Sequence, residues 1–371
     1  MIKLSFLEGK NILVTGGAGF IGSNFIRFIL NNYKDVEFRL YNLDVLTYAG
    51  NLSNLIDIHD DSRYYFIYGD IANEDFIYQV IGDLKIDVII NFAAESHVDR
   101  SILSPHDFIR TNVYGTFTLL DVARKLWKEE DREEKLFLHI STDEVFGDLE
   151  IDDPPFTETT PYKPSSPYSA SKASSDHFVR AYGRTYKLPI NITNCSNNYG
   201  PYQFPEKLIP TVISKILKDE YIPIYGTGEN IRDWIYVDDH NRGVLYVIEK
   251  GVRGQSYNIG ARNEKTNLEI VHKICDIMDE KLNREIGTSR KLIRFVNDRP
   301  GHDKRYAMDP TKIETTLGWM VGVDFENGIR KTIDWYLSNQ KWIDDILTGN
   351  YKEKNNKILE ELYEKGRCIR F

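Results

Sequence analysis

The feature that most constrains the fold is a repeated alternation of short apolar runs with helix-like segments in the first half of the chain. The run NILVT at Asn11–Thr15 is followed by a glycine-rich turn and by helix-like spacing over Ile21–Leu30. Similar runs predict further strands, at Val36–Asp44, Tyr64–Asp70, Ile86–Ala94, Leu136–Thr142 and Pro189–Cys195. Helical segments lie between them, notably Asp107–Trp127 and Tyr168–Tyr186. This alternation predicts an α/β fold with a parallel sheet covered by helices on both faces.

Three glycines follow the first predicted strand at a spacing that suits a bound dinucleotide. Gly16, Gly19 and Gly22 form the pattern GxxGxxG between a strand and a helix. Glycines let the turn tighten and let a pyrophosphate approach backbone N–H groups at the helix N-terminus. Asp44, at the end of the second strand, can accept hydrogen bonds from a ribose diol and repel a 2′-phosphate. We therefore expect a Rossmann-type fold that binds NAD rather than NADP; the alternative is a helix cap with an unrelated surface aspartate.

The composition and pattern of the sequence change after about residue 198, which predicts a second, smaller unit. The stretch NNYGPYQFPEKLIP is rich in proline, glycine and tyrosine, as expected of an ordered loop that crosses between domains. We predict an NAD-binding Rossmann domain over residues 1–198, with a doubly wound parallel sheet. A smaller C-terminal α/β substrate-binding domain is predicted mainly over residues 199–371. Later segments, roughly 232–262, are expected to return to the sheet, with QSYNIG as a candidate strand.

Composition and charge exclude several classes of protein. The 371 residues carry a formal net charge of -9, which argues against nucleic-acid binding as the main role. No apolar run approaches the roughly 18 residues needed to span a bilayer. The sparse cysteines, Cys195, Cys275 and Cys368, have no paired metal-type spacing, so we expect neither a metal site nor a disulfide framework. The sequence predicts a cytoplasmic protein with neither nucleic-acid nor membrane partners.

Tyr168 and Lys172 lie four residues apart in YSASK, on one face at the start of a predicted helix. A tyrosine with the reference pKa of about 10 is a poor base at neutral pH. A neighbouring ammonium, an oxidised nicotinamide and a helix N-terminus would each favour the phenolate. Thr142, at the end of a predicted strand, can donate to the substrate oxygen that Tyr168 deprotonates. Such a pair alone is common on solvated helix faces, but together with the glycine turn and Thr142 it indicates a catalytic site.

Two adjacent carboxylates, Asp143 and Glu144, come directly after the predicted strand, in the sequence STDEVFGD. Like charges at the end of a buried strand repel, and burial raises the free energy of ionising each one. A turn or a helix cap would be the plainest explanation of these acids. A division of labour between an acid and a base would explain their adjacency as well.

A series of segments, in order from Thr15 to about Asp309, resembles the dTDP-glucose 4,6-dehydratase family of the extended short-chain dehydrogenase/reductase superfamily. The segments are TGGAGFIGSNF, NLDVLTYAGN, NFAAESHVDRSI, STDEVFG, PYSASKASSDH, NCSNNYGPYQFPEKLIP, RDWIYVDDH and RPGHDKRYAMD. They cover most of the chain, and so many matches in the family order are specific for the family.

The resemblance implies NAD-dependent dehydration of dTDP-glucose to dTDP-4-keto-6-deoxyglucose. In this chemistry Tyr168 removes the proton of the sugar C4 hydroxyl while a hydride passes from C4 to NAD. The resemblance assigns Glu144 as the base for the C5 proton and Asp143 as the acid for the departing C6 hydroxyl, after which the hydride returns to C6. Asp143 would have to stay protonated near neutral pH, and both burial and the adjacent Glu144 act in that direction.

The resemblance also implies which residues contact the reacting groups. The expected catalytic residues are Thr142, Asp143, Glu144, Tyr168 and Lys172. The expected cofactor contacts are Gly16, Gly19, Phe20, Ile21, Gly22, Asp44, Thr47, Gly50, Asp70, Ile71, Ala93, Ala94, Ser96, Thr111, Tyr168, Lys172 and Asn198. The expected nucleotide-sugar contacts are Ser96, Thr142, Asn197, Lys207, Leu208, Pro223, Tyr225, Arg232, Asn267, Arg299, His302 and Tyr306. Arg232 and Arg299 suit a diphosphate by bidentate geometry, and Asp70 is expected near the adenine, with a helix N-cap as its alternative role.

The chain departs from the family pattern at Phe146, where a tyrosine is usual, and at Val45, where a basic residue is common. The affinity for the cofactor could differ as a result. The resemblance further implies a homodimer, formed through the helices Asp107–Trp127 and Tyr168–Tyr186, whose apolar and aromatic residues lie on more than one face. The charged stretch Lys352–Phe371 predicts a surface helix.

Three alternatives stay open on the sequence. A nucleotide-sugar 4-epimerase would share NAD, Tyr168 and Lys172 but would not need the adjacent carboxylates. Another nucleotide-sugar 4,6-dehydratase, acting on a CDP-, GDP- or UDP-sugar, would keep the pair and differ in its base-binding loops. A non-enzymatic NAD-dependent sensor would be expected to lack Tyr168 or Lys172, and both are present. The sequence does not specify the deoxysugar pathway that follows, rhamnose or another.

Overall fold

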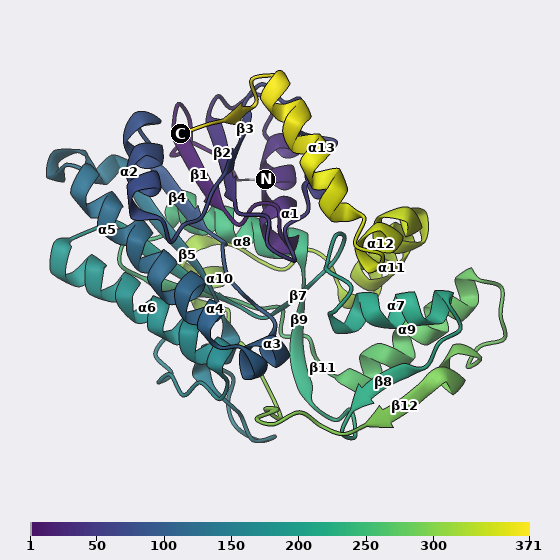
Figure 1. The fold of residues 1–371 in the computed structure, drawn as a ribbon. Helices are drawn as coiled ribbons and strands as arrows, with labels where there is room; N and C mark the ends of the chain where they lie inside the picture. The colour runs from purple at the N-terminus through teal and green to yellow at the C-terminus, as the bar shows by residue number, and fades with distance from the viewer. Residues whose placement is uncertain (1) are drawn as a thin grey trace.

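A parallel sheet of eight strands forms the centre of the molecule (Figure 1). The computed structural model describes residues 2–371. The strands follow the order β10-β6-β5-β4-β1-β2-β3-β13, and every neighbouring pair is parallel. Their bounds are β1 Asn11–Thr15, β2 Arg39–Asp44, β3 Tyr64–Tyr68, β4 Val88–Asn91, β5 Leu136–Thr142, β6 Ile190–Cys195, β10 Ser256–Ile259 and β13 Cys368–Ile369. Because the chain order reverses between β1 and β4, the predicted doubly wound Rossmann-type sheet is confirmed.

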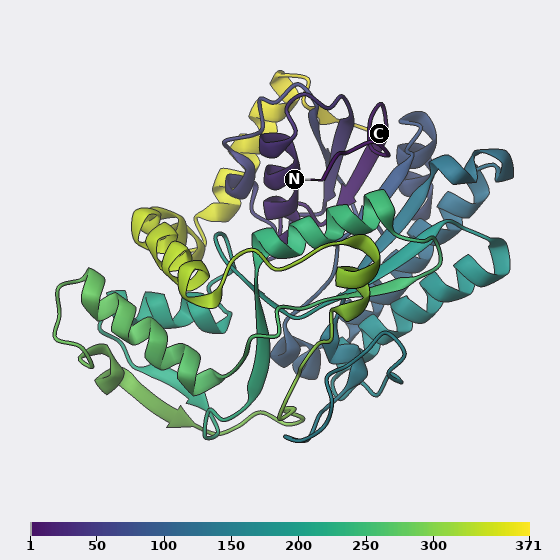
Figure 2. The ribbon, with the colours of Figure 1, turned by 180° about the vertical axis from the view of Figure 1, so that it is seen from behind.

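Helices cover both faces of this sheet, as Figures 1 and 2 show from opposite sides. One face holds α1 Phe20–Asn32, α8 Val237–Lys250, α10 Thr311–Leu317 and α13 Tyr351–Glu364. The other holds α2 Glu74–Asp83, α5 Thr116–Leu126 and α6 Pro167–Tyr186. The alternation of side chains along a strand explains the two layers: Ile12 and Val14 of β1 pack on the first face and Leu13 on the second. Strands buried on both faces read as continuous apolar runs, which is how the sequence reveals them.

A second group of elements has a hydrophobic core of its own, which includes Ile213, Ile274 and Ile333. Its strands are β7 Asn197–Tyr199, β8 Ile222–Tyr225, β9 Ile231–Tyr236, β11 Glu264–Thr266 and β12 Ile293–Val296. Its helices are α7 Leu208–Leu217, α9 Asn267–Lys281, α11 Phe325–Ser338 and α12 Gln340–Leu347. Figure 1 shows this group to the lower right of the central sheet. On this basis we keep the predicted division of the chain near residue 198 as a proposal.

Several predicted elements have different ends in the structure. The second strand begins at Arg39 rather than Val36, and the fourth ends at Asn91 because residues 92–94 turn out of the sheet. The predicted helix Asp107–Trp127 consists of α4 His106–Phe108, a π-helical segment Ile109–Gly115 and α5. Such π-helical turns inside α-helices are frequent at functional sites. The remaining short helices are η1 Leu52–Leu55, α3 Val98–Leu103, η3 Glu129–Glu134, η4 Asp143–Phe146 and η5 Ser289–Leu292.

The end of the chain lies against the central sheet. The predicted surface helix is present as α13, but the strand that follows it was not predicted. Cys368 and Ile369 form β13, which pairs with Phe66 and Ile67 of β3 at the edge of the central sheet. Two residues carry too little pattern to be recognised as a strand. Within residues 2–371 no helix combines the length and the apolar character that crossing a membrane requires.

Candidate active site

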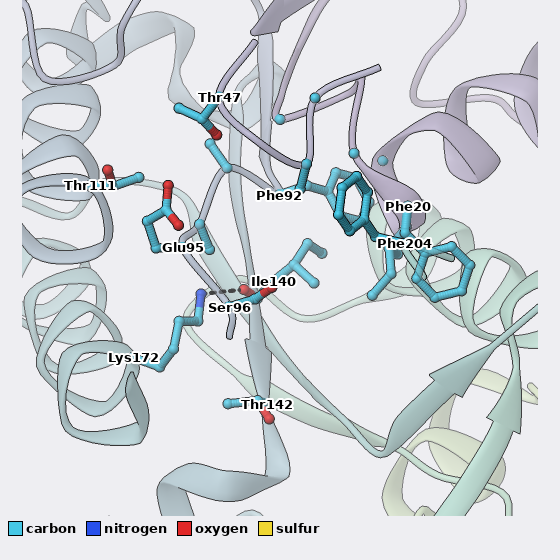
Figure 3. Close-up of a pocket in the computed structure, with 18 of the residues that line it drawn as sticks. Phe20, Thr47, Phe92, Glu95, Ser96, Thr111, Ile140, Thr142, Lys172 and Phe204 are labelled. Atoms are coloured by element: carbon cyan, nitrogen blue, oxygen red, sulfur yellow. Dashed lines mark hydrogen bonds between the residues drawn. The ribbon is translucent and has the colours of Figure 1, made fainter. Parts of the chain in front are cut away.

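A cavity opens at the carboxyl ends of the central strands, where ligands bind in sheets of this kind (Figure 3). All residues predicted to contact the cofactor line it, and so do all five predicted catalytic residues. The cofactor set is Gly16, Gly19, Phe20, Ile21, Gly22, Asp44, Thr47, Gly50, Asp70, Ile71, Ala93, Ala94, Ser96, Thr111, Tyr168, Lys172 and Asn198. The fold therefore gathers at one place residues that are up to 182 positions apart in the sequence, since the set runs from Gly16 to Asn198 (198 minus 16).

The glycine turn brings the backbone of β1 against the end of β4. Gly16 has φ +71°, and a Cβ atom there would stand 2.6 Å from the Cα and N atoms of Ala93. A Cβ at Gly22 would stand 2.4 Å from the carbonyl oxygen of Gly16, so the helix also starts very close to the turn. In this described part of the chain no side chain caps α1. Its first N–H groups therefore face the cavity, where an anion can accept from them.

Asp44 ends β2 with its carboxylate held by the backbone on both oxygens. Oδ2 accepts from the N–H of Ala18 at 2.9 Å, and Oδ1 accepts from the N–H of Leu46 at 2.8 Å. Burial raises the pKa of Asp44, while the two N–H groups lower it. A carboxylate has about four acceptor sites, so this one keeps capacity for a ribose diol.

Asp70 is not a helix N-cap, so the alternative role considered for it is wrong. The N-cap of α2 is Asn73, whose side chain accepts from the N–H of Phe76. Asp70 instead accepts from the N–H of Ala72 at 2.8 Å and forms an ion pair with Arg110 at 2.7 Å. Arg110 also lines the cavity, although no sequence pattern indicated it.

Tyr168 and Lys172 reach the cavity from the first turns of α6. Ser166 caps this helix by accepting from the N–H of Ser169, and Pro167 occupies the first position of the helix. The ammonium of Lys172 donates to the carbonyl oxygen of Ile140 at 2.7 Å, as Figure 3 shows, and burial lowers its pKa to about 8. Burial and the nearby Glu144 carboxylate raise the pKa of Tyr168 well above its usual value, against a hydrogen bond with Thr142 that lowers it. The protein groups alone therefore favour the neutral phenol, and the phenolate needs further positive charge in the cavity.

Asp143 and Glu144 follow β5 in the short helix η4, and their surroundings differ. Asp143 accepts from the hydroxyl of Thr142 at 3.1 Å; burial and the adjacent Glu144 raise its pKa well above the usual range. Burial also raises the pKa of Glu144, but the positive charges of Arg299, Arg232 and Lys207 oppose that rise. The two environments thus separate the pKa values of the two carboxyls, with Asp143 as the better proton donor and Glu144 as the better acceptor.

The residues predicted to contact the nucleotide sugar fall into two groups. Ser96, Thr142, Asn197 and Lys207 line the cavity, and the Lys207 ammonium donates to the carbonyl oxygen of Ser96 at 3.1 Å. The others lie beyond residue 198 and outside the lining of this cavity: Leu208, Pro223, Tyr225, Arg232, Asn267, Arg299, His302 and Tyr306.

Contacts among the residues outside the cavity lining bring most of the polar ones together. The Arg232 guanidinium stacks on the ring of Tyr306, 4.2 Å from its centre, and donates to the carbonyl oxygen of Asp303 at 2.9 Å. Arg299 and Tyr225 both contact the carboxylate of Asp99 at 3.5 Å. The ring of His302 lies 6.5 Å from that of Tyr225. The positive charges of Arg232 and Arg299 lie close enough to the cavity to act on Glu144.

A buried polar network beneath Lys172 was not predicted from the sequence. The ring nitrogen Nε2 of His139 lies 3.4 Å from the Lys172 ammonium and 3.4 Å from the carboxylate of Asp176. Asp176 also accepts from the hydroxyls of Ser141 at 2.9 Å and Tyr162 at 2.6 Å. The one available signal was His139 inside an otherwise apolar strand, since a buried polar side chain needs partners.

Comparisons with known proteins agree with this geometry. Residues 13–332 match the sequence model of a family described as GDP-mannose 4,6 dehydratase. The chain is 53% identical over 364 residues to dTDP-glucose 4,6-dehydratase 1 of Escherichia coli (strain K12), covering 95% of this chain and 99% of that protein. It is 55% identical over 340 residues to a dTDP-glucose 4,6-dehydratase of Neisseria gonorrhoeae, covering 90% and 97%.

Solved structures with the same architecture include both dehydratases and epimerases. The dTDP-glucose 4,6-dehydratase DesIV of Streptomyces venezuelae, with NAD and TYD bound, has a TM-score of 0.83 at 43% identity and covers 91% of this chain and 99% of its own. UDP-glucose 4-epimerase of Thermotoga maritima has a TM-score of 0.77 at 27% identity, covering 89% and 99%. The fold is therefore shared by both activities, while the higher identity lies with the dehydratases.

The close approach at Gly16 predicts a specific loss on substitution. Gly16→Ala is expected to weaken NAD binding at least about ten-fold, because the added methyl group displaces the turn from Ala93. Gly9→Ala is the matched control, since Gly9 has φ +73° and nothing within 4 Å of an added Cβ. Both variants should lose some thermal stability, but only Gly16→Ala should lose NAD affinity in a titration. Equal affinities in the two variants would contradict this account of the turn.

The raised pKa of Asp143 predicts how stability depends on pH. Folded protein holds this proton at a higher pH than unfolded protein, so stability falls as pH rises from about 4 through the folded-state pKa. Asp143→Asn removes this contribution, and its stability relative to the wild type should therefore increase as pH rises. Urea unfolding across that range measures the difference, with the exposed Asp152→Asn as a control. A difference that does not change with pH would show that Asp143 ionises normally.

Proposed function

The chain belongs to the dTDP-glucose 4,6-dehydratase family, and we propose that the cavity residues Tyr168, Glu144 and Asp143 remove water from dTDP-glucose in successive proton transfers. The observation that carries this proposal is the pair of adjacent carboxyls in different environments: Asp143 is buried with a pKa raised well above its usual range, and Glu144 is half-buried with cations that oppose the rise of its pKa. A 4-epimerase needs proton transfer at C4 only, so it has no use for a second acid and base at C5 and C6. Elimination alone leaves a 4-keto-5,6-ene, and the 4-keto-6-deoxy sugar nucleotide would form when the hydride returns from the reduced cofactor to C6 and C5 regains a proton.

The residues at the cavity fit NAD, which solved relatives contain. The Gly16 turn leaves no room for a side chain and aims the N–H groups of α1 at the cavity, as a pyrophosphate requires. Asp44 keeps acceptor capacity for a ribose diol, and its negative charge disfavours a 2′-phosphate. When bound, NAD supplies reversible oxidation of the sugar and a positive charge next to the catalytic tyrosine.

Tyr168 acts first in the proposed sequence, as the base for the C4 hydroxyl proton. Thr142 donates to the oxygen that loses this proton and so holds the hydroxyl toward the phenol oxygen. Lys172, buried with a pKa of about 8, carries a positive charge at neutral pH and favours the phenolate through its field. The resulting C4 ketone makes the C5 hydrogen acidic.

Elimination then uses the two carboxyls on adjacent atoms of the sugar. Glu144 takes the proton from C5, and the electron pair of that bond forms the C5–C6 double bond as the C6–O bond breaks. Asp143 gives its proton to the departing hydroxyl, which leaves as water. The step converts an ionised Glu144 and a protonated Asp143 into their opposites. Both pKa values are raised, but that of Asp143 is raised well above its usual range, whereas nearby cations oppose the rise at Glu144, which suits this exchange.

Cations of the second unit suit the diphosphate of the substrate. Lys207, Arg232 and Arg299 all act on Glu144 electrostatically, so their charges converge on the same cavity. In a protein with a net charge of -9, such a local concentration of positive charge is what an anionic nucleotide needs. We propose dTDP rather than GDP as the nucleotide because the relatives of about 52% identity carry the dTDP name over nearly the full chain.

We also propose a homodimer through the outer surface of α4, α5 and α6. Ile109 and Tyr114 of the π-helical segment between α4 and α5, and Phe178 of α6, are large apolar side chains that stay exposed. Aromatic contacts connect them, with Phe117 at 5.9 Å from Tyr114 and 6.0 Å from Phe178. A contiguous apolar strip across two helices is a typical surface for a second copy.

A cytoplasmic location stays our proposal, based on the sparse cysteines.

The carboxyl roles predict a partial reaction in one variant. Wild-type protein should convert dTDP-glucose to the 4-keto-6-deoxy product, whereas Glu144→Gln should oxidise C4 slowly and stop, because an amide cannot take the C5 proton. Absorbance of reduced cofactor and mass analysis of the sugar nucleotide distinguish the two outcomes. The exposed Glu133→Gln serves as the control and should behave as wild type. Normal elimination by Glu144→Gln would overturn the base assignment, and turnover of GDP-mannose but not dTDP-glucose would overturn the substrate.

The proposed interface predicts a change in oligomeric state. Phe178→Arg should convert the dimer to a monomer, because it places a charge in the centre of the apolar strip. Light scattering after size-exclusion chromatography measures the mass. Val252→Arg, at an exposed apolar residue far from the strip in the sequence, should leave the dimer intact. A wild-type mass equal to a single chain would rule the proposal out.

A further inference from the structure

The C-terminal helix α13 (yellow in Figure 1) packs against η1 and bonds to the segment that connects β2 to η1. We define the β2–η1 loop as residues 45–51. Thr47 and Gly50 of this loop line the cavity beside Asp44. The reaction described above makes no use of α13, and the sequence offered no role for it. Its contacts with the β2–η1 loop suggest one.

The side chain of Asn355 connects α13 to the end of the loop and to the first residue of η1 through two hydrogen bonds. Its Oδ1 accepts from the N–H of Leu52 at 2.8 Å, and its Nδ2 donates to the carbonyl oxygen of Gly50 at 2.9 Å. Asn355 is 4% exposed, so water does not replace these bonds if they are lost. A primary amide offers one donor and one acceptor in the geometry that two backbone groups two residues apart require.

Tyr351, one turn earlier on α13, makes a second connection. Its hydroxyl donates to the carbonyl oxygen of Tyr48 at 2.8 Å. Its ring packs edge-on against Phe204, which lines the cavity and also contacts the ring of Tyr48. The same helix therefore holds the loop at its middle and at its end.

The β2–η1 loop in turn contacts the glycine turn. The N–H of Asn51 and the side-chain amide of Asn54 both donate to the carbonyl oxygen of Ala18 at 3.0 Å. The indole N–H of Trp342, from α12, donates to the Asn54 side chain at 2.9 Å. Ala18 also donates its N–H to Asp44. A displacement of the loop would thus reach both elements that hold the dinucleotide.

The loop has a conformation that local interactions alone do not favour. Leu46 has φ +54°, a region that residues with a side chain seldom adopt. A Cβ at Gly50 would stand 2.8 Å from the Cα of Leu46, so the chain doubles back tightly. Tight segments of this kind persist when surrounding structure determines them. At the far end, β13 and the ion pair of Lys365 with Asp60 at 2.8 Å anchor the C-terminal segment.

We propose that Asn355 and Tyr351 are positioning residues for the cofactor, and that α13 holds the β2–η1 loop in the shape that receives NAD beside Asp44. The inference rests on NAD as the cofactor of the proposed function. Part of the binding free energy of NAD is then supplied by a segment that does not touch it. Loss of the contacts that Asn355 and Tyr351 make with the β2–η1 loop should weaken NAD binding and leave the chemistry at saturating NAD unchanged.

Adjacent asparagines give a matched test. Asn355→Ala removes both hydrogen bonds, whereas Asn356→Ala makes the same change at an exposed position of the same helix. Equilibrium dialysis should show NAD affinity about ten-fold weaker in Asn355→Ala, the effect of about one buried hydrogen bond, and unchanged in Asn356→Ala. At saturating NAD, kcat and the KM for dTDP-glucose should match the wild type. Faster hydrogen exchange at the Leu52 amide should accompany the loss.

A second variant covers the case in which Asn355→Ala does not fold. Tyr351→Phe keeps the ring and removes only the hydroxyl, and it should weaken NAD binding about three-fold. Wild-type affinity for NAD in the folded variants, with or without a lower melting temperature, would overturn the inference and leave the proposed function intact. Failure of the wild-type protein to bind NAD would instead overturn the proposed function.

Discussion

Asp143 and Glu144 are adjacent carboxyl groups at the end of a buried strand, and little water is present to screen the repulsion between them. Ionising both would be costly, so one proton stays with the pair. Asp143 holds it because its neighbours add negative charge, whereas Glu144 faces the cations of the second unit. The chemistry of the site depends on this asymmetry. It requires β5 at the centre of the sheet and the second unit folded back over its carboxyl end.

Local patterns were sufficient to predict the parts of this site that lie close together in the sequence. The glycine turn, the Tyr168–Lys172 spacing and the acid pair each occupy a few consecutive residues at the end of one element. Apolar runs located the central strands, because strands buried on both faces contain little else. Assignment of the carboxyl roles required the resemblance to a family, since adjacency alone does not say which acid keeps its proton. The structure adds the reason: Arg232 acts on both carboxyls, whereas the charges of Arg299 and Lys207 oppose the rise in pKa at Glu144.

Contacts between distant segments were beyond such patterns. Asn355 meets Gly50 only because the chain returns to the sheet edge after more than 300 residues, a separation of 305. The partners of Lys172 in the buried network come from β5 and from the next turn of α6, and no spacing rule connects His139 to Asp176. The raised pKa of Tyr168 was likewise unexpected, because burial and the Glu144 carboxylate outweigh the hydrogen bond with Thr142 that lowers it. Each of these depends on burial and on tertiary contact.

The protonation state of Asp143 at neutral pH decides whether the two carboxyls divide the acid and base roles. Difference infrared spectroscopy of the wild type and Asp143→Asn at neutral pH, with labelled aspartate, separates a protonated carboxyl from a carboxylate. The account predicts a carbonyl stretch of a protonated carboxyl in the wild type that is absent from Asp143→Asn and persists above the usual pKa range of aspartate. A spectrum in which Asp143 contributes only carboxylate bands at neutral pH would contradict the assignment of the two carboxyls.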